Sequence, residues 1–431
     1  MANSYLTHTQ TADSSNTKFT FSFWMKRSSI SASQCIYATQ SGSDEARIEI
    51  NSSDELFLYK YNGSFQWKLQ TNRKFRDIFA WYHIVLKYDS TQSTSSDRLK
   101  LYVNGVEETS FASSTYPGSS ENSNFFQGAV AYIGCSENTA AFFDGYLSHV
   151  AMTHGYAYAP TTFGETDSTS GIWKFKSPSG VTWGTQGYHL KFENSGALGT
   201  DSSGQSNTFA VNGNLKQALD TPSNVYCAWN PLYPAGMTFA NGNTKLTQGS
   251  AWKSMGGTLA VSSGKWYWEI KNSGNYAYLG FADIKLFNEG CATRESFTVN
   301  AATTGTAYSM LSSSGTLNSV AASGSQNQKT YTGATYGNDI IGIALNLDDN
   351  EATWYKNGTA LNSGTPLSID AGTYIPAASL YGNSCEANFG NGFFGTTAIT
   401  SAGSNGNGSL FEYDVPSGYY ALNTKNINTY G

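Results

Sequence analysis

LKLYVNG, residues 99–105, returns in similar form as ATWYKNG, residues 352–358. Each stretch is a short alternating run that ends in Asn-Gly, the dipeptide that favours a two-residue hairpin with positive φ at both turn positions. Each follows another alternating run, WYHIVLKY at residues 81–88 and DIIGIALNL at residues 339–347. The chain therefore carries one β-meander in each half, which predicts two separate sandwiches that bury their inward-facing rows.

The composition agrees with an all-β chain of two domains. Two domains are the first expectation for 431 residues. Aromatic residues make up 14% of the chain, charged residues 13%, and Gly numbers 44, as is typical of short strands joined by tight turns. FTFSFW at residues 19–24 alternates, with its Phe residues on one face of a strand. We expect such strands to stay soluble by facing Ser, Thr and Asn outward.

The charge pattern excludes several classes of partner. The formal net charge is -6, from 25 Lys and Arg against 31 Asp and Glu, and there is no basic stripe, so we expect no nucleic acid partner. No apolar run approaches the roughly 18 residues that cross a bilayer, so we expect no membrane insertion. The start, MANSYLTHTQ, lacks the pattern of a signal peptide. We therefore expect synthesis in a cytosol without signal-directed export.

The five cysteines, at positions 35, 135, 227, 291 and 385, stand far apart in the sequence. Their number is odd and no C-x-x-C pair occurs, which argues against a disulfide framework and against a zinc site. We expect each to be a small buried apolar residue.

The domain boundary is predicted from proline. Pro222, Pro231 and Pro234 are three of the nine prolines and lie close together in the sequence. Because proline has no backbone N–H to donate to a neighbouring strand, this stretch favours a connector over a central strand. The prediction is a first domain at residues 1–218, a linker at 219–236, a second domain at 237–394 and a C-terminal tail at 395–431. Residues 160–187 should form a long ordered loop on the first domain, and the aromatic tail should dock rather than float.

The first half resembles a laminin-G-like, concanavalin-type jelly-roll. The residues that carry the resemblance, in order along residues 5–160, are FTFSFWMKR at 19–27, WYHIVLKYD at 81–89, LKLYVNGVEE at 99–108, YIGC at 132–135 and FFDGYLSHVAM at 142–152.

The second half resembles a SPRY domain over residues 237–394. The carriers are SSGKWYWEIK at 262–271, YAYLGFAD at 276–283, the strand pair and Asn-Gly turn within 336–361, and GTYIPAASLYGNSCEANFG at 372–390. The resemblance implies partner binding through loops at one end of the sandwich, here including residues 285–297 and 381–386. The fold class is therefore all-β, with two antiparallel sandwiches and an ordered connector.

The join between the halves is similar to a connector in structural proteins of tailed bacteriophages. Residues 188–207 and 220–231 carry this similarity, together with the ending VPSGYYALNTKNI. It implies a virion protein of the tail-fibre or appendage kind, located on the virion surface after synthesis in the host cytoplasm. Other virion proteins would be its partners, and a homo-oligomer is the expected assembly.

Enzymatic chemistry finds little support in the residues. Retaining glucanases of the jelly-roll type use a Glu-x-Asp-x-Glu strand, whose spacing places two carboxylates on one face, and this sequence lacks it. The nearest carboxylates lie in DEARIE at residues 44–49 and at Asp54-Glu55, without the required spacing. All five His residues lie in the first half, and none adjoins a Gly-x-Ser-x-Gly elbow. We therefore predict that the protein is not an enzyme and uses no cofactor.

Calcium is the one metal with a candidate loop. Asp201, Ser203 and Asn207 offer oxygens in TDSSGQSN at residues 200–207, and Ca²⁺ prefers such hard ligands. The loop is too short to supply six to eight ligands alone, so the favoured interpretation is a turn in which Asp201 accepts a downstream backbone N–H.

Binding residues are sought among loop aromatics, because aromatic rings are platforms for carbohydrate. The candidates are Tyr116, Tyr156, Tyr158, Trp183, Trp252 and Tyr381. The leading hypothesis is a virion surface protein, a tail fibre or appendage, that recognises a host-surface glycan or protein by aromatic anchors and multivalency. The alternatives are a capsid or collar decoration protein without receptor binding, and a polysaccharide depolymerase.

Overall fold

The computed structural model describes residues 3–123, 125–233, 236–288, 306–320, 326–330 and 335–431. It divides into two compact units, which are treated separately below. Unit 1 is Met1–Gln217 with Thr221–Ser223, and unit 2 is Ala218–Asp220 with Asn224–Gly431. Neither unit contains, in its described part, a helix long and apolar enough to cross a membrane.

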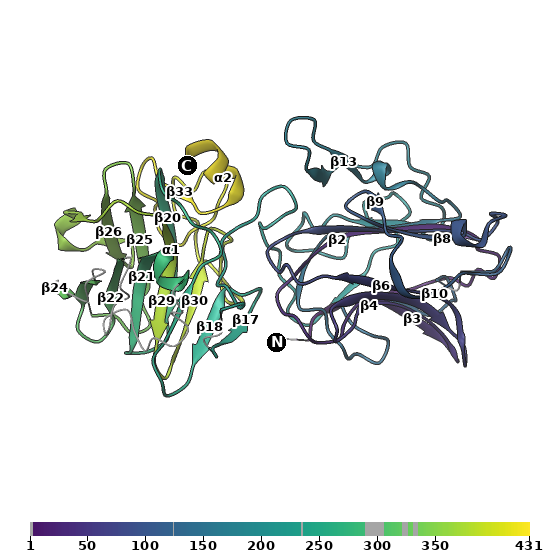
Figure 1. The fold of residues 1–431 in the computed structure, drawn as a ribbon, viewed down its shortest axis with the longest axis horizontal. Helices are drawn as coiled ribbons and strands as arrows, with labels where there is room; N and C mark the ends of the chain where they lie inside the picture. The colour runs from purple at the N-terminus through teal and green to yellow at the C-terminus, as the bar shows by residue number, and fades with distance from the viewer. Residues whose placement is uncertain (1–2, 124, 234–235, 289–305, 321–325, 331–334) are drawn as a thin grey trace. The chain divides into compact units, whose positions relative to one another are not determined.

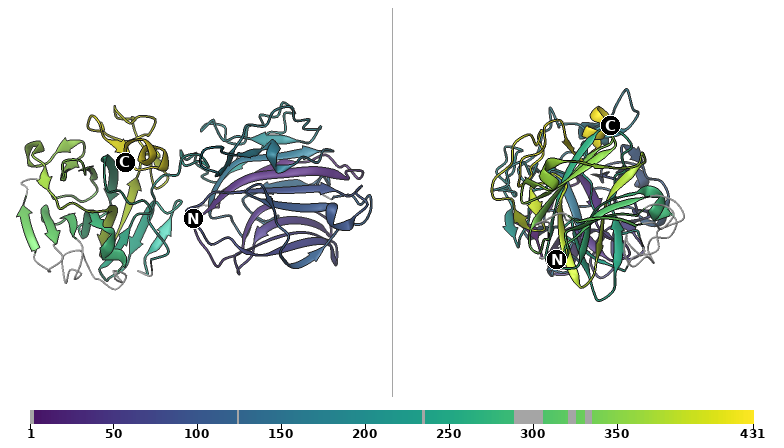
Figure 2. Two further views of the ribbon diagram at one scale, coloured as in Figure 1. Left: turned by 45° about the horizontal axis from the view of Figure 1, so that its top comes forward. Right: turned by 90° about the vertical axis from the view of Figure 1, so that its left-hand side faces the viewer.

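Unit 1 is a sandwich of two antiparallel sheets that face each other across one core (Figures 1 and 2). The larger sheet has the order β10 (Phe111–Thr115), β6 (Phe65–Lys74), β5 (Glu55–Tyr61), β4 (Asp44–Ile50), β3 (Gln34–Ser41), β11 (Val130–Ile133), β1 (Tyr5–Thr9), β16 (Ala210–Asn212). The smaller sheet has the order β15 (Tyr188–Leu190), β12 (Gly145–His154), β2 (Lys18–Arg27), β7 (Tyr82–Asp89), β8 (Leu99–Val103), β9 (Val106–Glu107).

The central strand β2 is buried on both faces, which differs from the outward-facing polar row that the sequence predicts. Phe19, Phe21 and Phe23 face the core and are fully buried, as predicted. Ser22 and Trp24 on the opposite face are also buried, at 1–2% exposure. The alternation is therefore correct, but a further layer of the chain covers the outer face.

That layer is a segment that we call the strap, residues 155–187. It contains the small sheet of β13 (Gly164–Thr166) and β14 (Trp173–Phe175), which lies beyond β2 and β9 on the side away from β3, β4 and β6 (Figure 1). Its rings cover histidines on the outer face. Trp173 Nε1 donates to His83 Nδ1 at 2.9 Å, and the Phe175 ring stacks on His149 with centroids 3.6 Å apart.

Unit 2 is a second sandwich of two mainly antiparallel sheets. The larger sheet has the order β17 (Thr238–Ala240), β18 (Lys245–Gln248), β30 (Asn383–Asn388), β20 (Lys265–Asn272), β25 (Ile340–Asn346), β26 (Glu351–Lys356), β27 (Thr359–Ala360), with β28 (Leu367–Ser368) paired to β26 and β33 (Tyr420–Ala421) paired to β20. The smaller sheet has the order β19 (Lys253–Gly256), β29 (Tyr374–Leu380), β21 (Ala277–Asp283), β22 (Ala307–Leu311), β23 (Thr316–Val320), β24 (Gln326–Thr330). The remaining elements are β31 (Phe393–Phe394), β32 (Thr397–Ala398), and the helices α1 (Ile284–Asn288) and α2 (Thr424–Tyr430).

Part of the predicted linker, residues 219–236, is core of unit 2. The Trp229 side chain is fully buried there, and Tyr226 and Cys227 are nearly so. The backbone of this stretch also bonds to the end of the chain, where Cys227 N–H donates to the Leu422 carbonyl at 3.0 Å. Burial of these side chains stabilises the unit by about 1.5–3 kcal/mol for each large group, which is why the segment folds despite its prolines.

Both Asn-Gly hairpins form as predicted, and they are alike in detail. Asn104 and Gly105 have φ of 49° and 79°, and Asn357 and Gly358 have φ of 47° and 78°. The Asn104 side chain accepts from His83 N–H at 2.8 Å, as the Asn357 side chain does from Ile340 N–H at 2.9 Å. Each Asn side chain thus ties its turn to the start of the neighbouring strand, β7 in unit 1 and β25 in unit 2. This bond fixes the register of the strand pair.

Each turn also receives an aromatic ring from a later segment. A Cβ at Gly105 would lie 2.5 Å from Trp173 of the strap, and a Cβ at Gly358 would lie 2.6 Å from Tyr413. The rings occupy space that any other residue at these positions would fill. Glycine is therefore required at both turns for its backbone conformation and for its lack of a side chain.

Residues 395–431, the C-terminal segment, belong to unit 2 and cover the outer face of its larger sheet. Glu269 on β20 is fully buried, and its two carboxylate oxygens accept the backbone N–H groups of Glu412 and Tyr413, each at 2.9 Å. Phe411 packs edge-to-face on Tyr267. Burial raises the pKa of Glu269 to about 7, although the N–H groups of Glu412 and Tyr413 partly oppose this.

Replacing Gly105 with Ala should destabilise unit 1 by more than the cost of positive φ alone. We expect a loss of about 2–4 kcal/mol in the free energy of unfolding, because a backbone strain of ~1 kcal/mol adds to the displacement of Trp173. Gly63→Ala is the matched control, since Gly63 has φ of 69° and nothing within 4 Å of a Cβ. Equal losses for the two variants in denaturant unfolding would show that the Trp173 contact is unimportant.

Glu269 should make the stability of unit 2 depend on pH. Folding raises the pKa of this carboxyl from 4.5 to about 7, so the folded state holds the proton more tightly than the unfolded chain does. The contribution of Glu269 to the free energy of unfolding therefore falls as pH rises from 4.5 to about 7, with a slope of up to about 1.4 kcal/mol per pH unit. Above the upper pKa this contribution no longer changes with pH. The difference between wild type and the non-titrating Glu269→Gln, measured by urea unfolding, should carry this slope. A pH-independent difference would contradict the assignment.

Candidate binding surface

Three aromatic side chains form one row across adjacent strands of the smaller sheet of unit 2. Trp252 directly precedes β19, Tyr381 directly follows β29 and Tyr276 directly precedes β21. The strands pair so that the next residues, Lys253, Leu380 and Ala277, stand opposite one another. Because Leu380 and Ala277 are fully buried in the core, alternation turns the three rings to the outer face. We call Trp252, Tyr276 and Tyr381 the aromatic row.

The rings of the aromatic row contact one another; Tyr276 and Tyr381 are open to solvent, and Trp252 is half-buried. The ring centroids of Trp252 and Tyr381 lie 5.6 Å apart, and those of Tyr381 and Tyr276 lie 6.1 Å apart. Tyr276 is 54% exposed and Tyr381 is 38% exposed. Tyr278, on the same face of β21, packs against Trp252 at 5.2 Å and supports it. The result is a contiguous aromatic platform at the edge of a rigid sheet.

Backbone hydrogen bonds hold the three loops of this platform together. Tyr381 N–H donates to the Tyr276 carbonyl at 3.1 Å, and Gly382 N–H donates to the Gly249 carbonyl at 2.7 Å. The Gln248 side chain closes the first loop on the Ala251 carbonyl at 3.0 Å. Because the chain's own hydrogen bonds tie these loops together, a ligand would meet a surface that is already arranged.

Two of the six aromatic residues expected to bind, Trp252 and Tyr381, thus meet in one surface. Tyr276 and Tyr278 were not among the candidates, although their spacing in YAYLGFAD already places them on one face of a strand. The sequence does not reveal that β19 and β21 pair with opposite edges of β29. This pairing brings together aromatic residues that are far apart in the chain.

The other four candidates lie in unit 1 and do not join into a comparable surface. Tyr116 packs against the hydrophobic core. Trp183 of the strap stacks on His189 at 5.5 Å. Tyr156 and Tyr158 stack on each other at 6.3 Å, but the Tyr158 hydroxyl already accepts the Thr182 N–H. Of these four, Tyr156 is the most open, at 43% exposure. Of the SPRY-type loop at 285–297, residues 289–297 lie outside the described residues.

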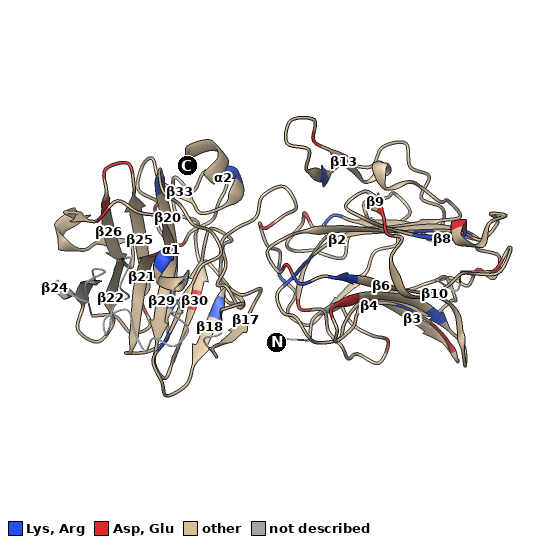
Figure 3. Ribbon diagram, in the orientation of Figure 1, with Lys and Arg blue, Asp and Glu red and all other residues tan. Residues whose placement is uncertain are grey.

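The two glutamates of DEARIE are engaged by an arginine. Glu45, Glu49 and Glu137 lie 2.9, 3.3 and 2.6 Å from the Arg47 guanidinium. Glu45, Arg47 and Glu49 belong to β4, which carries charged positions in Figure 3, and Glu137 follows β11. Burial raises the pKa of Glu49, and Arg47 opposes this. The arrangement is an ion cluster around one cation, and not a pair of acids separated by room for a sugar bond.

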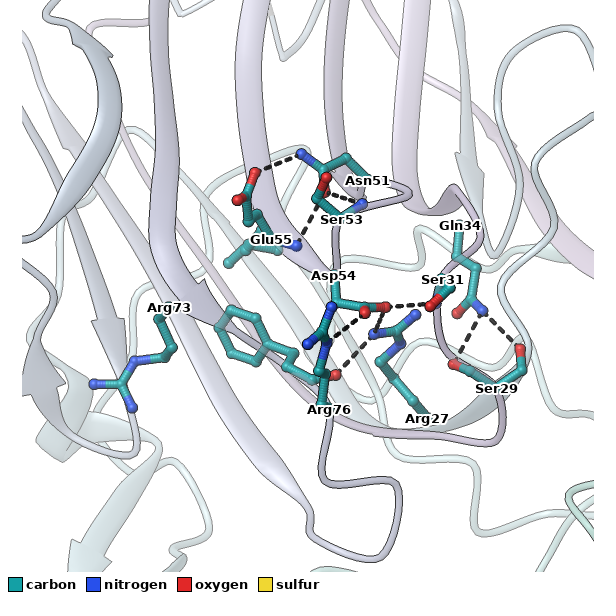
Figure 4. Close-up of polar contacts among 12 residues, drawn as sticks. Arg27, Ser29, Ser31, Gln34, Asn51, Ser53, Asp54, Glu55, Arg73 and Arg76 are labelled. Carbon is teal, nitrogen blue, oxygen red and sulfur yellow. Dashed lines mark hydrogen bonds and ion pairs between the residues drawn. The ribbon is translucent and has the colours of Figure 1, made fainter. Parts of the chain in front are cut away.

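Asp54 and Glu55 are structural as well (Figure 4). The fully buried Asp54 accepts Arg27 Nη1 at 2.9 Å, Arg76 Nε at 2.8 Å and Ser31 N–H at 2.7 Å. Burial opposes ionisation of Asp54, but these hydrogen bonds outweigh it, so its pKa lies below the usual value. Hydrogen bonds from Asn51 and Gln70 lower the pKa of Glu55. A catalytic general acid requires the opposite shift.

A buried serine–histidine pair occurs in unit 1 but is arranged for packing. Ser22 Oγ lies 2.9 Å from His83 Nε2. Because the Trp173 indole donates to His83 Nδ1, the single proton of the neutral ring sits on Nε2 and is donated to Ser22. Burial, with a contribution from His149, lowers the pKa of His83 to about 3. His83 therefore cannot accept the Ser22 proton, and both side chains are at most 1% exposed.

The candidate calcium loop is a closed turn in the structure. Asp201 Oδ1 accepts His189 N–H and Ser203 N–H, and Asp201 Oδ2 accepts Ser203 Oγ–H and Asn207 N–H, at 2.8–2.9 Å. Asp201, Ser203 and Asn207 do come together, but as donors and acceptors to one another. Throughout the described residues, no three His, Cys, Asp or Glu side chains gather as a metal site would require. Cys35, Cys135, Cys227 and Cys385 are buried and free; Cys291 lies outside the described residues.

Comparison with known proteins identifies both sandwiches. The model of the concanavalin A-like lectin/glucanases superfamily matches residues 1–157, and the model of the SPRY domain matches residues 265–392. No curated protein matches the chain. The all-β architecture of a concanavalin-like and a SPRY sandwich is thereby confirmed.

Several solved structures are similar in fold to parts of the chain. The SPRY domain of human HERC1 is 16% identical, with 37% of this chain and 96% of that chain covered, at a TM-score of 0.30. The PSpry domain of TRIM65 is 13% identical, with coverage of 38% and 91%, at a TM-score of 0.28. A heptameric SAP-like pentraxin from Limulus polyphemus is 16% identical, with coverage of 36% and 71%, at a TM-score of 0.27.

Ser22 should be inert towards serine-directed reagents. We expect a fluorophosphonate probe to leave Ser22 unlabelled in the folded protein between about pH 6 and pH 8, because its neighbour His83 is neutral and donates to it. Intact-protein mass spectrometry with peptide mapping measures this. Stoichiometric labelling of Ser22 that disappears in His83→Gln would reverse the interpretation.

Proposed function

We propose that this chain, which joins a concanavalin-like sandwich to a SPRY sandwich, is a recognition protein. It binds a ligand on a cell surface and performs no chemistry on that ligand. The single observation that carries the proposal is the aromatic row. Its three rings contact one another at the ends of paired strands of a rigid sheet, and Tyr276 and Tyr381 are exposed to solvent, as is expected of an anchor for binding. The two matched domain types support a binding role.

The buried polar groups of the described residues support binding over catalysis. Glu45 and Glu49 are held by Arg47, and Asp54 is held by Arg27 and Arg76. The Ser22–His83 pair is buried under the strap. A polysaccharide depolymerase would require a solvent-accessible acid pair with separated pKa values. Sustained release of reducing ends from host polysaccharide by the purified protein would argue for that alternative.

We extend the proposal to the setting in which the protein acts, the surface of a tailed-phage virion, as a tail fibre or appendage. The similarity of residues 188–207, 220–231 and the C-terminal VPSGYYALNTKNI to virion proteins supports this. Many copies on one particle would raise overall affinity without new contacts, because each binding event after the first is intramolecular. Immunogold label at tail tips would support the proposal, and label over the capsid lattice would favour the decoration alternative.

Loss of the aromatic row should abolish binding to host cells while the fold is kept. We expect Trp252→Ala combined with Tyr276→Ala to weaken binding of the labelled protein at least tenfold, because each anchor ring contributes about 1–3 kcal/mol. Flow cytometry over a concentration series measures the change.

The matched control is Tyr61→Ala combined with Phe65→Ala in unit 1. These residues are 36% and 39% exposed and touch at 5.2 Å, so the control removes a similar exposed aromatic pair elsewhere. Unfolding curves should confirm that both variants are folded. Undiminished binding by the unit 2 variant, or an equal loss in the control, would refute the aromatic row as the binding surface.

A further inference from the structure

We infer that the ligand of the aromatic row is an uncharged saccharide, laid across β19, β29 and β21. This inference rests on the proposed function and gives its ligand a chemical class. It depends on three properties of the surface: the polar atoms at the tips of the rings, the charges around them and the residues at their border.

The polar tips of the row are neutral donors without protein partners. In the described part of unit 2, no hydrogen bond joins Trp252 Nε1, Tyr276 Oη or Tyr381 Oη to another protein atom, whereas the buried Tyr336 hydroxyl bonds to backbone carbonyls. The surface thus offers apolar ring faces bordered by N–H and O–H groups. A pyranose is complementary to such a surface, because it has a C–H face and a rim of hydroxyl groups.

The charges near the row are directed away or paired. Lys253 occupies the register position opposite Leu380, whose side chain points into the core, so Lys253 leaves the sheet on the face opposite to Trp252. On the larger sheet, Asp339 directly before β25 and Lys356 at the end of β26 pair with each other at 3.4 Å. Among the residues that the structure describes, the platform therefore has no charged side chain to select an acidic ligand, and a charged ligand would lose hydration without compensation there.

The border of the row is small and polar. Its exposed neighbours on the three loops are Gly249, Ser250, Ala251, Ser273, Asn275 and Gly382, of which Ser250, Ser273 and Asn275 carry polar side chains. A protein interface of ordinary strength surrounds its anchor residues with a wide, water-excluding ring of contacts. Here hydroxyl and amide groups begin directly beyond the rings, which is the pattern of a site for a narrow, polar and chain-like ligand.

The direct test is calorimetric titration of the full-length protein with soluble polysaccharides. The probes are a neutral β-glucan, a neutral mannan and a neutral galactan, with alginate as the acidic comparison. We expect at least one neutral polymer to bind, with an affinity that changes less than about twofold between low and high salt. Trp252→Ala should weaken that binding about tenfold or more.

The conservative variants Tyr276→Phe and Tyr381→Phe separate the ring from its hydroxyl group. Each keeps the platform and removes one donor, so each should weaken binding of the neutral polymer about three- to tenfold. The control Tyr61→Phe in unit 1 should leave the affinity unchanged. Binding of alginate alone, with an affinity that falls steeply with salt, would overturn the inference, as would the absence of binding to any of the four polymers.

Treated host cells distinguish failure of this inference from failure of the proposed function. Periodate, which cleaves sugar diols, should abolish binding of the labelled protein, and protease treatment should leave it. Loss after protease only, with the Trp252 and Tyr276 variants still defective, would refute the saccharide and retain the binding surface. Full binding by those variants would refute the surface itself.

Discussion

Both units depend on one steric constraint: the hairpin turn must end in a residue without a side chain, because another part of the chain lies directly on it. Gly105 lies under Trp173 and Gly358 lies under Tyr413. An Asn-Gly turn is usually explained by its backbone conformation alone. In this protein the same glycine also gives a later segment a place to dock, so that turn formation and coverage of the sheet are coupled.

The covering segment of each sandwich is held by a buried polar group, on β7 in unit 1 and on β20 in unit 2. In unit 1 the group is His83, which accepts the indole N–H of Trp173. In unit 2 it is Glu269, which accepts two backbone N–H groups of the C-terminal segment. A buried polar group costs free energy unless it is paired, so each anchor selects the one arrangement of the covering segment that satisfies it. The pKa values of the two groups move in opposite directions, yet burial favours the neutral form in both.

Coverage of the outer faces also explains where recognition can occur. The strap and the C-terminal segment occupy the broad outer face of one sheet in each unit. The aromatic row lies on the other sheet of unit 2, at strand ends, where tied loops bring three rings together. Tilted and edge-to-face contacts of the rings with one another, and of Trp252 with Tyr278, limit their motion, which lowers the entropy lost when a ligand binds. Binding is therefore expected at a strand end, and the broad sheet faces contribute stability.

The local structure follows from the order of residues: the alternating strands, the two Asn-Gly turns, the two sandwich types and the lack of a Glu-x-Asp-x-Glu acid strand. These features are set by residues next to one another, whose spacing fixes which side chains share a face. Three facts require the folded chain: Ser22 and Trp24 are covered, Trp229 of the predicted linker is core, and Tyr276 completes a row with Trp252 and Tyr381. Those facts depend on which strands pair across more than a hundred residues, and period-two alternation carries no information about the neighbouring strand.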